Sequence, residues 1–140
     1  MDPGFPTLSV SGVPAETNEI SGKIIHAALA LHREIGPGLL EKVYRIWLAE
    51  DLREAGLEVA EEVYAPLVRK GRRIDDAYRL DLLVGGRVIV EVKTVQEVLP
   101  VHLAQLRTYL KLTGCQVGLL LNFTSPRLKD GIHRLVWTAS

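Results

Sequence analysis

The spacing of apolar positions divides the first half of the chain into two helices and a strand. Apolar residues recur at helical intervals over 18–35 and again over 39–55, and a Gly-Pro-Gly sequence separates the two stretches. An imperfectly alternating stretch over 57–68 predicts a strand, because successive side chains of a strand point to opposite faces. Pro66 lacks the N–H group that a central strand needs, so this strand is expected at a sheet edge or with a bulge.

The second half of the chain predicts four more strands and one helix. Gly85-Gly86 lies between two apolar stretches and predicts a hairpin. A later, continuously apolar stretch is typical of a strand covered on both faces, and the helix before it should make it parallel to the preceding strand. The order α-α-β-β-β-α-β-β predicts an α/β (α+β) fold with a mixed β-sheet flanked by helices. These elements are strands over 77–84 and 87–94, a helix over 100–113, and strands over 117–123 and 132–137.

Composition indicates an ordinary globular protein. The chain has 140 residues, of which 47% are hydrophobic and 24% charged. Residues 1–16 are rich in proline and glycine and are interpreted as a flexible leader, which leaves 17–140 as a single domain. Cys115 is the only cysteine, which excludes an intrachain disulfide and a site of several thiolates. The sequence contains no apolar stretch of membrane-spanning length and no secretion signal, so we expect a cytoplasmic protein without a membrane partner.

Charge is balanced overall but uneven along the chain. Equal numbers of basic and acidic residues give no net charge, which argues against indiscriminate binding of polyanions. A basic cluster around the turn predicted over 70–76 is the candidate for contacts with nucleic acid phosphates. Its members are Arg69, Lys70, Arg72 and Arg73.

Three ionisable residues interrupt the apolar pattern of the two hairpin strands. Asp81 lies in the first strand, and Glu91 and Lys93 lie in the second. A buried charge is costly unless it is paired or binds a metal, so three such groups on adjacent core strands form the candidate site. Glu91 and Lys93 share a face of their strand because they are two residues apart.

The register of the hairpin decides whether Asp81 joins the other two. A strict two-residue turn at Gly85-Gly86 would place Asp81 opposite Val90 and on the other side of the sheet from Glu91. A three-residue loop that includes Arg87, or one bulge, would place Asp81 directly across from Glu91. A functional site therefore requires an odd loop length or a bulge.

Two neighbouring carboxylates suggest a divalent cation. Acids about 5 Å apart repel each other unless a proton or a cation lies between them. An all-oxygen site suits Mg²⁺ or Mn²⁺, and such an ion polarises a phosphoryl oxygen and lowers the pKa of a bound water. Lys93 would then orient that water or stabilise charge developing on the phosphate. The alternative interpretation is a buried ion pair between one acid and Lys93 that only fixes strand register.

Polar residues on two predicted helices are placed to support this site. His102, Gln105 and Tyr109 form a stripe beside the apolar stripe of the helix over 100–113, where that helix would meet the sheet. The alternative is that Gln105 and Tyr109 are boundary residues of the helix. Glu41 lies in the first turn of the second helix, where the helix dipole favours a negative charge. It is either a charge at the helix terminus or a third carboxylate near the metal.

Five short segments resemble, in their order and spacing, the signatures of the small bacterial GxxExxY proteins. That family is placed in the PD-(D/E)XK nuclease superfamily, whose core order α-β-β-β-α-β is similar to the order predicted here from residue 39 onward. The resemblance covers about 18–137 and implies a restriction-endonuclease-like core. The segments are GLLEKVY at 38–44, YRLDLLV at 78–84, VEVK at 90–93, QLRTYL at 105–110 and NFTSPRLKDG at 122–131.

The resemblance implies a role for each residue of the strand site. Asp81 and Glu91 would bind Mg²⁺ or Mn²⁺, with the main-chain carbonyl of Val92 as a third ligand. Lys93 would be the catalytic lysine. Leu80-Asp81 replaces the proline-aspartate pair of the superfamily, a variation that leaves the aspartate itself in place.

The same resemblance assigns roles to the helices. Members of the superfamily that are RecB-like add a glutamate on a helix before the core strands and a Gln-x-x-x-Tyr helix after them. By this resemblance Glu41 would be an additional acidic ligand or a water-binding group. Gln105 and Tyr109 would form the supporting helix motif, whereas His102 matches a residue common in the family to which we assign no role.

The leading hypothesis is a divalent-metal-dependent nuclease that hydrolyses phosphodiester bonds of single- or double-stranded DNA. The alternative from a different class is a non-catalytic module that binds nucleic acid or protein on the same fold. A metal hydrolase of small phosphate esters ranks last, because the chain has little to enclose a small substrate. The predicted edge strand over 57–68 and the apolar residues 135–137 also suggest a homodimer.

Overall fold

The computed structural model describes residues 12–138 and confirms the predicted order of helices and strands. Residues 1–11 of the expected leader lie outside the described residues. The first helix begins at Ala15, before the expected start at Asn18, and Val13 is fully buried. The elements are α1 (Ala15–Ile35), α2 (Glu41–Glu54), β1 (Val59–Arg69), β2 (Arg72–Val84), β3 (Val88–Lys93), α3 (Pro100–Thr113), β4 (Val117–Asn122), η1 (Leu128–Gly131) and β5 (Ile132–Val136).

One mixed sheet of the order β1-β2-β3-β4-β5 organises the described chain. β3 and β4 are parallel, and α3 connects them, which confirms the predicted crossover. The other neighbouring strands are antiparallel. β3 is therefore the central strand, and it carries Glu91 and Lys93.

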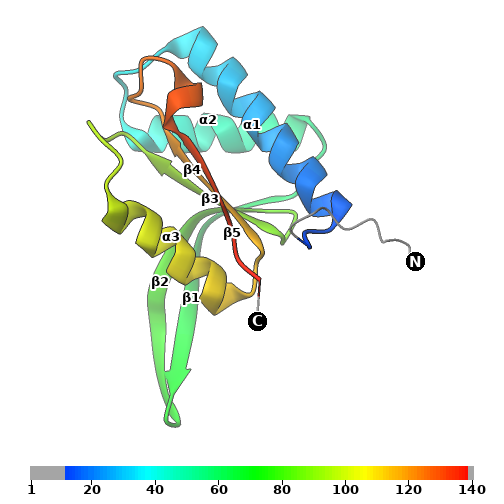
Figure 1. The fold of residues 1–140 in the computed structure, drawn as a ribbon, viewed down its shortest axis with the longest axis vertical. Coiled ribbons are helices and arrows are strands. Elements are labelled where there is room, and N and C mark those ends of the chain that lie inside the picture. Colours follow the sequence, from blue (N-terminus) through cyan, green and yellow to red (C-terminus); the bar gives the residue numbers. More distant parts are fainter. Residues whose placement is uncertain (1–11, 139–140) are drawn as a thin grey trace.

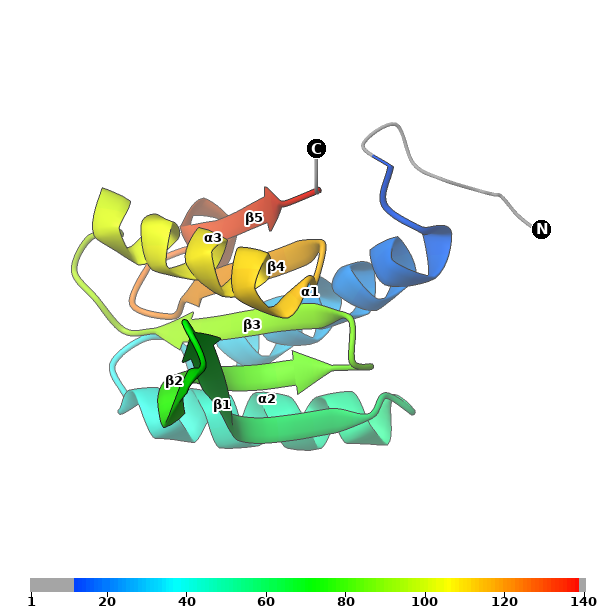
Figure 2. The same cartoon turned by 90° about the horizontal axis from the view of Figure 1, so that it is seen from below.

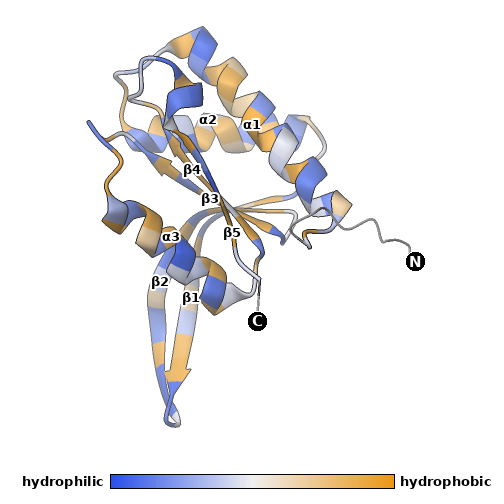
Figure 3. Cartoon of the chain, viewed as in Figure 1, coloured by the Kyte–Doolittle hydropathy of each residue, from blue (hydrophilic) through white to orange (hydrophobic). Residues whose placement is uncertain are grey.

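Helices cover both faces of this sheet (Figure 2). α1 and α2 pack on one face, in a core that includes Val90 and Val92 of β3. α3 packs on the other face, where Leu106 and Leu110 share a core with Ile89. Figure 3 shows the apolar colouring gathered on the central strands and on the helices beside them. Because alternate residues of β3 point to opposite cores, Glu91 and Lys93 lie on the α3 side of the sheet.

β1 and β2 extend beyond the sheet as a long two-stranded hairpin (Figure 1). β3 pairs with β2 only along Leu82–Val84, whereas β1 pairs with β2 from the sheet to the hairpin tip. We call residues 63–80, the part of the hairpin beyond the last pair with β3, the arm. The arm is thus a ribbon of two strands that leaves the sheet beside the candidate site.

A bend at Glu62 and Asp81 separates the arm from the sheet. Glu62 adopts a φ of 49°, a value that non-glycine residues rarely adopt. Leu82 packs in the core beneath α1 and α2, but Leu80 packs in the core beneath α3. Residues two apart in a regular strand share a face, so β2 must rotate between these leucines. The candidate metal ligand Asp81 lies at this rotation.

The hairpin between β2 and β3 has the odd loop that a functional site requires. Val84 pairs with Val88, and the main-chain N–H of Arg87 donates to the carbonyl of Val84 at 3.0 Å. Gly85, Gly86 and Arg87 therefore form a three-residue loop. The predicted register, with Asp81 on the same side as Glu91, is confirmed.

The prediction of a basic turn over 70–76 is wrong. The turn consists of Lys70 and Gly71, whose φ values of 53° and 75° are those of a two-residue type I′ turn. Arg72 and Arg73 are instead the first residues of β2. Since a type I′ turn matches the twist of the strands, pairing continues to Arg69 and Arg72 directly beside it.

The expectations for the strand over 57–68 are confirmed. β1 lies at the edge of the sheet, and its register with β2 shifts between Ala65 and Leu67, around Pro66. The chain between β4 and β5 contains the 3-10 helix η1. Within residues 12–138, no helix is long and apolar enough to cross a membrane.

Candidate functional site

Asp81 and Glu91 hold each other's strands together where β2 separates from β3. The main-chain N–H of Asp81 donates to Glu91 Oε2 at 3.1 Å. In return, the main-chain N–H of Val92 donates to Asp81 Oδ2 at 2.9 Å. Each acid is only 4% exposed. Side-chain carboxylates thus replace main-chain carbonyls at the point where the ladder from Val84 to Leu82 ends.

The environment of Glu91 favours its protonated form. Burial and, second, the negative charge of Asp81 raise the pKa of Glu91 from its ordinary value of 4.5 to about 8. The positive charges of Lys93 and Arg79 oppose this shift. In the metal-free protein at neutral pH, a proton therefore remains on the carboxylate pair. A divalent cation would remove the same repulsion by taking the place of that proton.

Glu41 and Lys93 lie within electrostatic range of this pair. Glu41 is the first residue of α2 and is half-buried. Its pKa is raised by burial and by the charge of Asp81, and the charge of Lys93 acts in the opposite direction. Lys93 lies one pleat beyond Glu91 on the same face of β3. The fold therefore brings an acid from α2 and a lysine from β3 to the carboxylate pair.

Of the candidate residues on α3, Tyr109 lies within electrostatic range of the carboxylates, whereas Gln105 is exposed. The ring of Tyr109 stacks on Tyr78 of β2, with centroids 5.1 Å apart. Burial raises the pKa of Tyr109, and the charges of Glu91 and Asp81 raise it further. Gln105 is exposed and makes no hydrogen bond within the part of the chain that the structure describes.

His102 has a structural role that the sequence did not indicate. The ring Nδ1 of His102 accepts a hydrogen bond from the main-chain N–H of Leu99 at 2.9 Å. The main-chain N–H of His102 donates to the Leu99 carbonyl at 3.0 Å. These two bonds fix the first turn of α3, where main-chain groups lack helical partners. His102 therefore stabilises the helix that carries Tyr109.

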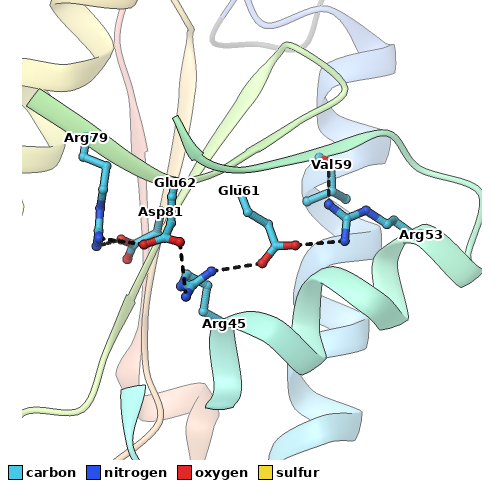
Figure 4. A network of polar contacts seen from close by, with 7 residues as sticks. All are labelled: Arg45, Arg53, Val59, Glu61, Glu62, Arg79 and Asp81. Carbon is cyan, nitrogen blue, oxygen red and sulfur yellow. Dashed lines mark hydrogen bonds and ion pairs between the residues drawn. The ribbon is translucent and has the colours of Figure 1, made fainter. Parts of the chain in front are cut away.

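Arg79 is a site residue to which the sequence assigned no role. Its guanidinium donates to Asp81 Oδ1 at 2.9 Å and to Glu62 Oε2 at 3.0 Å. Glu62 also lies 3.7 Å from Arg45 of α2, which in turn binds Glu61 at 2.9 Å. Figure 4 shows this network between α2 and the bend of the hairpin. The network restrains Oδ1 of Asp81, whereas the Val92 N–H restrains Oδ2. In the sequence, the role of Arg79 was indicated only by its position two residues before Asp81.

Tyr44, the last residue of the GLLEKVY segment, holds the loop that leads into α2. Its buried ring stacks on Phe123, with centroids 4.5 Å apart. Its hydroxyl donates to the Gly36 carbonyl at 2.6 Å and accepts from the Leu39 N–H at 3.2 Å. Because this loop sets where α2 begins, Tyr44 helps to place Glu41.

Asn122 fixes the chain on the other side of the site. Its Oδ1 accepts from the main-chain N–H of Val95 at 3.1 Å, and its Nδ2 donates to the Val95 carbonyl at 2.9 Å. Val95 lies just beyond Lys93, so the pair of bonds restrains the end of β3. Segments of the sequence that carry no reacting group therefore support the site structurally.

We expect Tyr44→Phe to lower the free energy of unfolding by about 1–2 kcal/mol, since the substitution leaves the Gly36 carbonyl and the Leu39 N–H without their partner. The ring and its stacking on Phe123 are kept. Urea denaturation followed by circular dichroism measures the change. In the matched control Tyr78→Phe, the hydroxyl removed makes no hydrogen bond within residues 12–138, and a change below about 0.5 kcal/mol is expected. Equal stability of Tyr44→Phe and the wild type would contradict the role given to the hydroxyl.

The oxygen atoms around the gap between β2 and β3 suit a hard divalent cation. The N–H and C=O of one strand residue point to the same side, so the Val92 carbonyl is directed to the gap into which its N–H donates. Two carboxylates and a carbonyl are ligands that Mg²⁺ and Mn²⁺ prefer. Among residues 12–138, no three His, Cys, Asp or Glu side chains are already grouped as a metal centre. An ion bound here would therefore keep several waters, as Mg²⁺ commonly does.

The basic cluster does not join the carboxylates. Its four residues lie at the tip of the arm, where all are exposed. Arg73 pairs with Val68 and Leu80 pairs with Val63, so about six residues of β1, roughly 20 Å of strand, lie alongside the span from Arg73 to Asp81. The candidate chemical site and the candidate phosphate contacts are thus at opposite ends of the arm. The cluster consists of Arg69, Lys70, Arg72 and Arg73.

Comparison with known families agrees with this geometry. Residues 18–135 match the model of the PD-(D/E)XK nuclease superfamily. No curated protein and no solved structure matches the chain. The matched range contains the carboxylate pair, both supporting helices and the whole arm.

Proposed function

The chain belongs to the PD-(D/E)XK nuclease superfamily, and from this premise we propose that it is a divalent-metal-dependent nuclease that hydrolyses phosphodiester bonds of DNA. The observation that carries the proposal is the buried pair of Asp81 and Glu91 at the gap between β2 and β3. The pair retains a proton when no metal is bound, because burial and mutual repulsion raise the pKa of Glu91 to about 8. Two buried acids side by side lower the stability of the folded protein, and binding of a cation would account for their presence.

In this proposal, Asp81 and Glu91 bind Mg²⁺ or Mn²⁺ together with the carbonyl of Val92. When bound, the ion polarises a phosphoryl oxygen and makes water more acidic. Arg79 keeps the Asp81 carboxylate in position through its hydrogen bond to Oδ1. Restraint of this kind matters because small displacements of a ligand lower the rate strongly.

The remaining candidate residues would contact the substrate, orient water or hold α3 in place. Lys93 stabilises negative charge that develops on the phosphate. Glu41 accepts a hydrogen bond from water at the edge of the gap and orients it. Tyr109, stacked on Tyr78, holds α3 against the strand that carries Asp81. Gln105 faces solvent on the same helix, where it is available to the backbone of a bound strand.

Two hollows of the described surface lie away from the carboxylates, which favours a polymer as the substrate. Their volumes are about 600 Å³ and 440 Å³, and neither is lined by Asp81, Glu91 or Lys93. The first lies between the end of α2 and the start of β1, and the second lies beside α1 and η1. A small ester would need an enclosing pocket, whereas a nucleic acid strand can be held along an open edge.

Metal titration of the wild type and of Asp81→Asn tests the proposal. We expect cleavage of single- or double-stranded DNA in Mg²⁺ or Mn²⁺, no cleavage in EDTA, and a loss of at least about 100-fold in Asp81→Asn, as for removal of a metal ligand. Glu50→Gln is the control, because this exposed residue of α2 loses a carboxylate far from the gap. Binding of DNA without cleavage in either metal would instead support the non-catalytic module.

A further inference from the structure

The base of the arm packs against α3 through Val63, Tyr78 and Leu80, but its outer part extends away from the rest of the fold (Figure 1). Beyond the bend, β1 and β2 pair only with each other. All of residues 69–76 are exposed, and the apolar side chains of Val68 and Ile74 are 63% and 62% exposed. A lone two-stranded hairpin is at best marginally stable in water. Such an arm is therefore expected to act through a partner.

Charges at the tip indicate that this partner is an anion. Arg69 and Arg72 are direct cross-strand partners, and Lys70 lies in the turn between them. Like charges directly opposite each other destabilise a hairpin, so stability does not explain this arrangement. Arg73 is paired with Asp75 at 2.6 Å. The other three cations have no ion-pair partner within residues 12–138, and they remain free for phosphates.

The shape of the tip suits the major groove of a duplex. That groove is about 12 Å wide and admits a two-stranded β-ribbon, whose strands lie about 4.8 Å apart. Leu67 pairs with Ile74 on the same face as Arg69 and Arg72, and Val68 pairs with Arg73 on the other face. The face with Arg69 and Arg72 thus combines free cations, which suit phosphates at the groove walls, with apolar groups, which suit base edges.

We propose that the arm inserts its tip into the major groove of duplex DNA and so makes double-stranded DNA the substrate class of the carboxylate site. This inference rests on the proposed function for its catalytic meaning. Proteins that hold single strands stack bases on aromatic side chains, but residues 67–76 contain no aromatic residue. The roughly 20 Å of strand between Arg73 and Asp81 places the groove contact within about 6 base pairs of the cut, at 3.4 Å per base pair.

The test compares Arg69→Ala/Arg72→Ala with Lys23→Ala/Arg33→Ala. The second variant removes the same charge from exposed positions of α1, away from the arm. Fluorescence anisotropy in EDTA measures the affinity for a duplex of about 24 base pairs, which exceeds two helical turns, and for a single strand of the same sequence, over a series of salt concentrations. Arg69→Gln/Arg72→Gln, which removes the charge but keeps a polar side chain, is measured in parallel, and circular dichroism confirms that each variant is folded.

We expect the wild type and the α1 control to prefer the duplex, and both arm variants to bind it about 10-fold or more weakly. The slope of log affinity against log salt should fall by about 1.8 in the arm variants, as for the loss of two phosphate contacts. Unchanged duplex affinity and slope in the folded arm variants would overturn the proposal. A wild type that binds single strands as well as duplex would overturn it too.

The same measurements separate this inference from its alternatives. A wild type that binds duplex through the arm but cleaves no DNA in Mg²⁺ or Mn²⁺ would refute the proposed function and leave the arm contact standing. Light scattering reports whether the arm instead joins two copies of this chain. A dimer that becomes monomeric in Arg69→Ala/Arg72→Ala, with an unchanged salt slope, would replace DNA by a second copy as the partner.

Discussion

Replacing Lys93 with alanine is expected to lower the rate of DNA hydrolysis by about 100- to 1000-fold, the loss typical for removal of one group that stabilises developing charge in a transition state. Lys93 shares a face of β3 with Glu91, and its charge acts on both Glu91 and Glu41. Lys93 is the half-buried last residue of β3, so its position relative to the carboxylates is fixed by the strand. Single-turnover cleavage at saturating Mn²⁺ measures the chemical step.

Lys42→Ala is the matched control, because Lys42 is an exposed residue of α2 one position beyond Glu41. Its rate is expected to stay within about 2-fold of the wild type. The Mn²⁺ concentration for half-maximal activity should also change little in Lys93→Ala, since the lysine is not a ligand. Full activity in Lys93→Ala would refute the role given to this residue.

Replacing Glu91 with glutamine is expected to stabilise the metal-free protein at high pH by an amount on the order of 5 kcal/mol while abolishing metal-dependent cleavage. The pKa of Glu91 is about 8 in the folded protein and near its ordinary 4.5 when unfolded. Between these values the folded state holds a proton that the unfolded state has lost. The stability that Glu91 contributes is therefore full below about pH 4.5 and declines until the pH passes about 8.

Glutamine imitates the protonated acid and cannot ionise. Its side-chain oxygen can still accept the hydrogen bond from the Asp81 N–H. Denaturation in EDTA at several pH values should show a decline for the wild type between these limits and a much smaller one for Glu91→Gln. The exposed Glu50→Gln should keep the decline of the wild type. A Glu91→Gln protein less stable than the wild type at pH 9 would show that the carboxylate is charged and paired in the fold.

The same reasoning predicts how Mn²⁺ stabilises the protein. Binding of the ion requires Glu91 to lose its proton, so the rise in melting temperature produced by Mn²⁺ should increase as the pH is raised toward 8. In Glu91→Gln the rise should be small at every pH. Differential scanning fluorimetry with and without Mn²⁺ measures both effects on the same samples.

Local patterns were sufficient to predict most elements and the pairing of the two acids. Apolar periodicity located the helices and strands, since each buried face repeats with the geometry of its element. The spacing of Asp81 and Glu91 around Gly85-Gly86 showed that the two acids share a side only with an odd loop or a bulge, which the functional hypothesis required, and the structure has the odd loop. Pro66 lacks a main-chain N–H, and this local property was sufficient to predict an irregular edge strand.

What the patterns missed depends on contacts between distant residues. The turn over 70–76 was misplaced because the basic and acidic residues there resemble a loop in composition, yet Lys70 and Gly71 alone supply the two positive φ values of the turn. Arg79 gained a role only when the hairpin bend brought it to Asp81 and Glu62. The exposure of Gln105 was likewise set by packing, through the rotation of α3 against the sheet, and its predicted role stays a prediction.

The sequence by itself determined the order of the elements, the faces that each one buries and the presence of two acids and a lysine on neighbouring core strands, because these follow from periodicity along the chain. Only the tertiary structure decided that β2 leaves β3 after Leu82, that the freed arm carries its cations roughly 20 Å from the acids, and that burial beside Asp81 raises the pKa of Glu91. Strand separation results from competition among pairing partners, and a pKa results from burial and charges acting through space. Neither quantity is encoded in the spacing of residues.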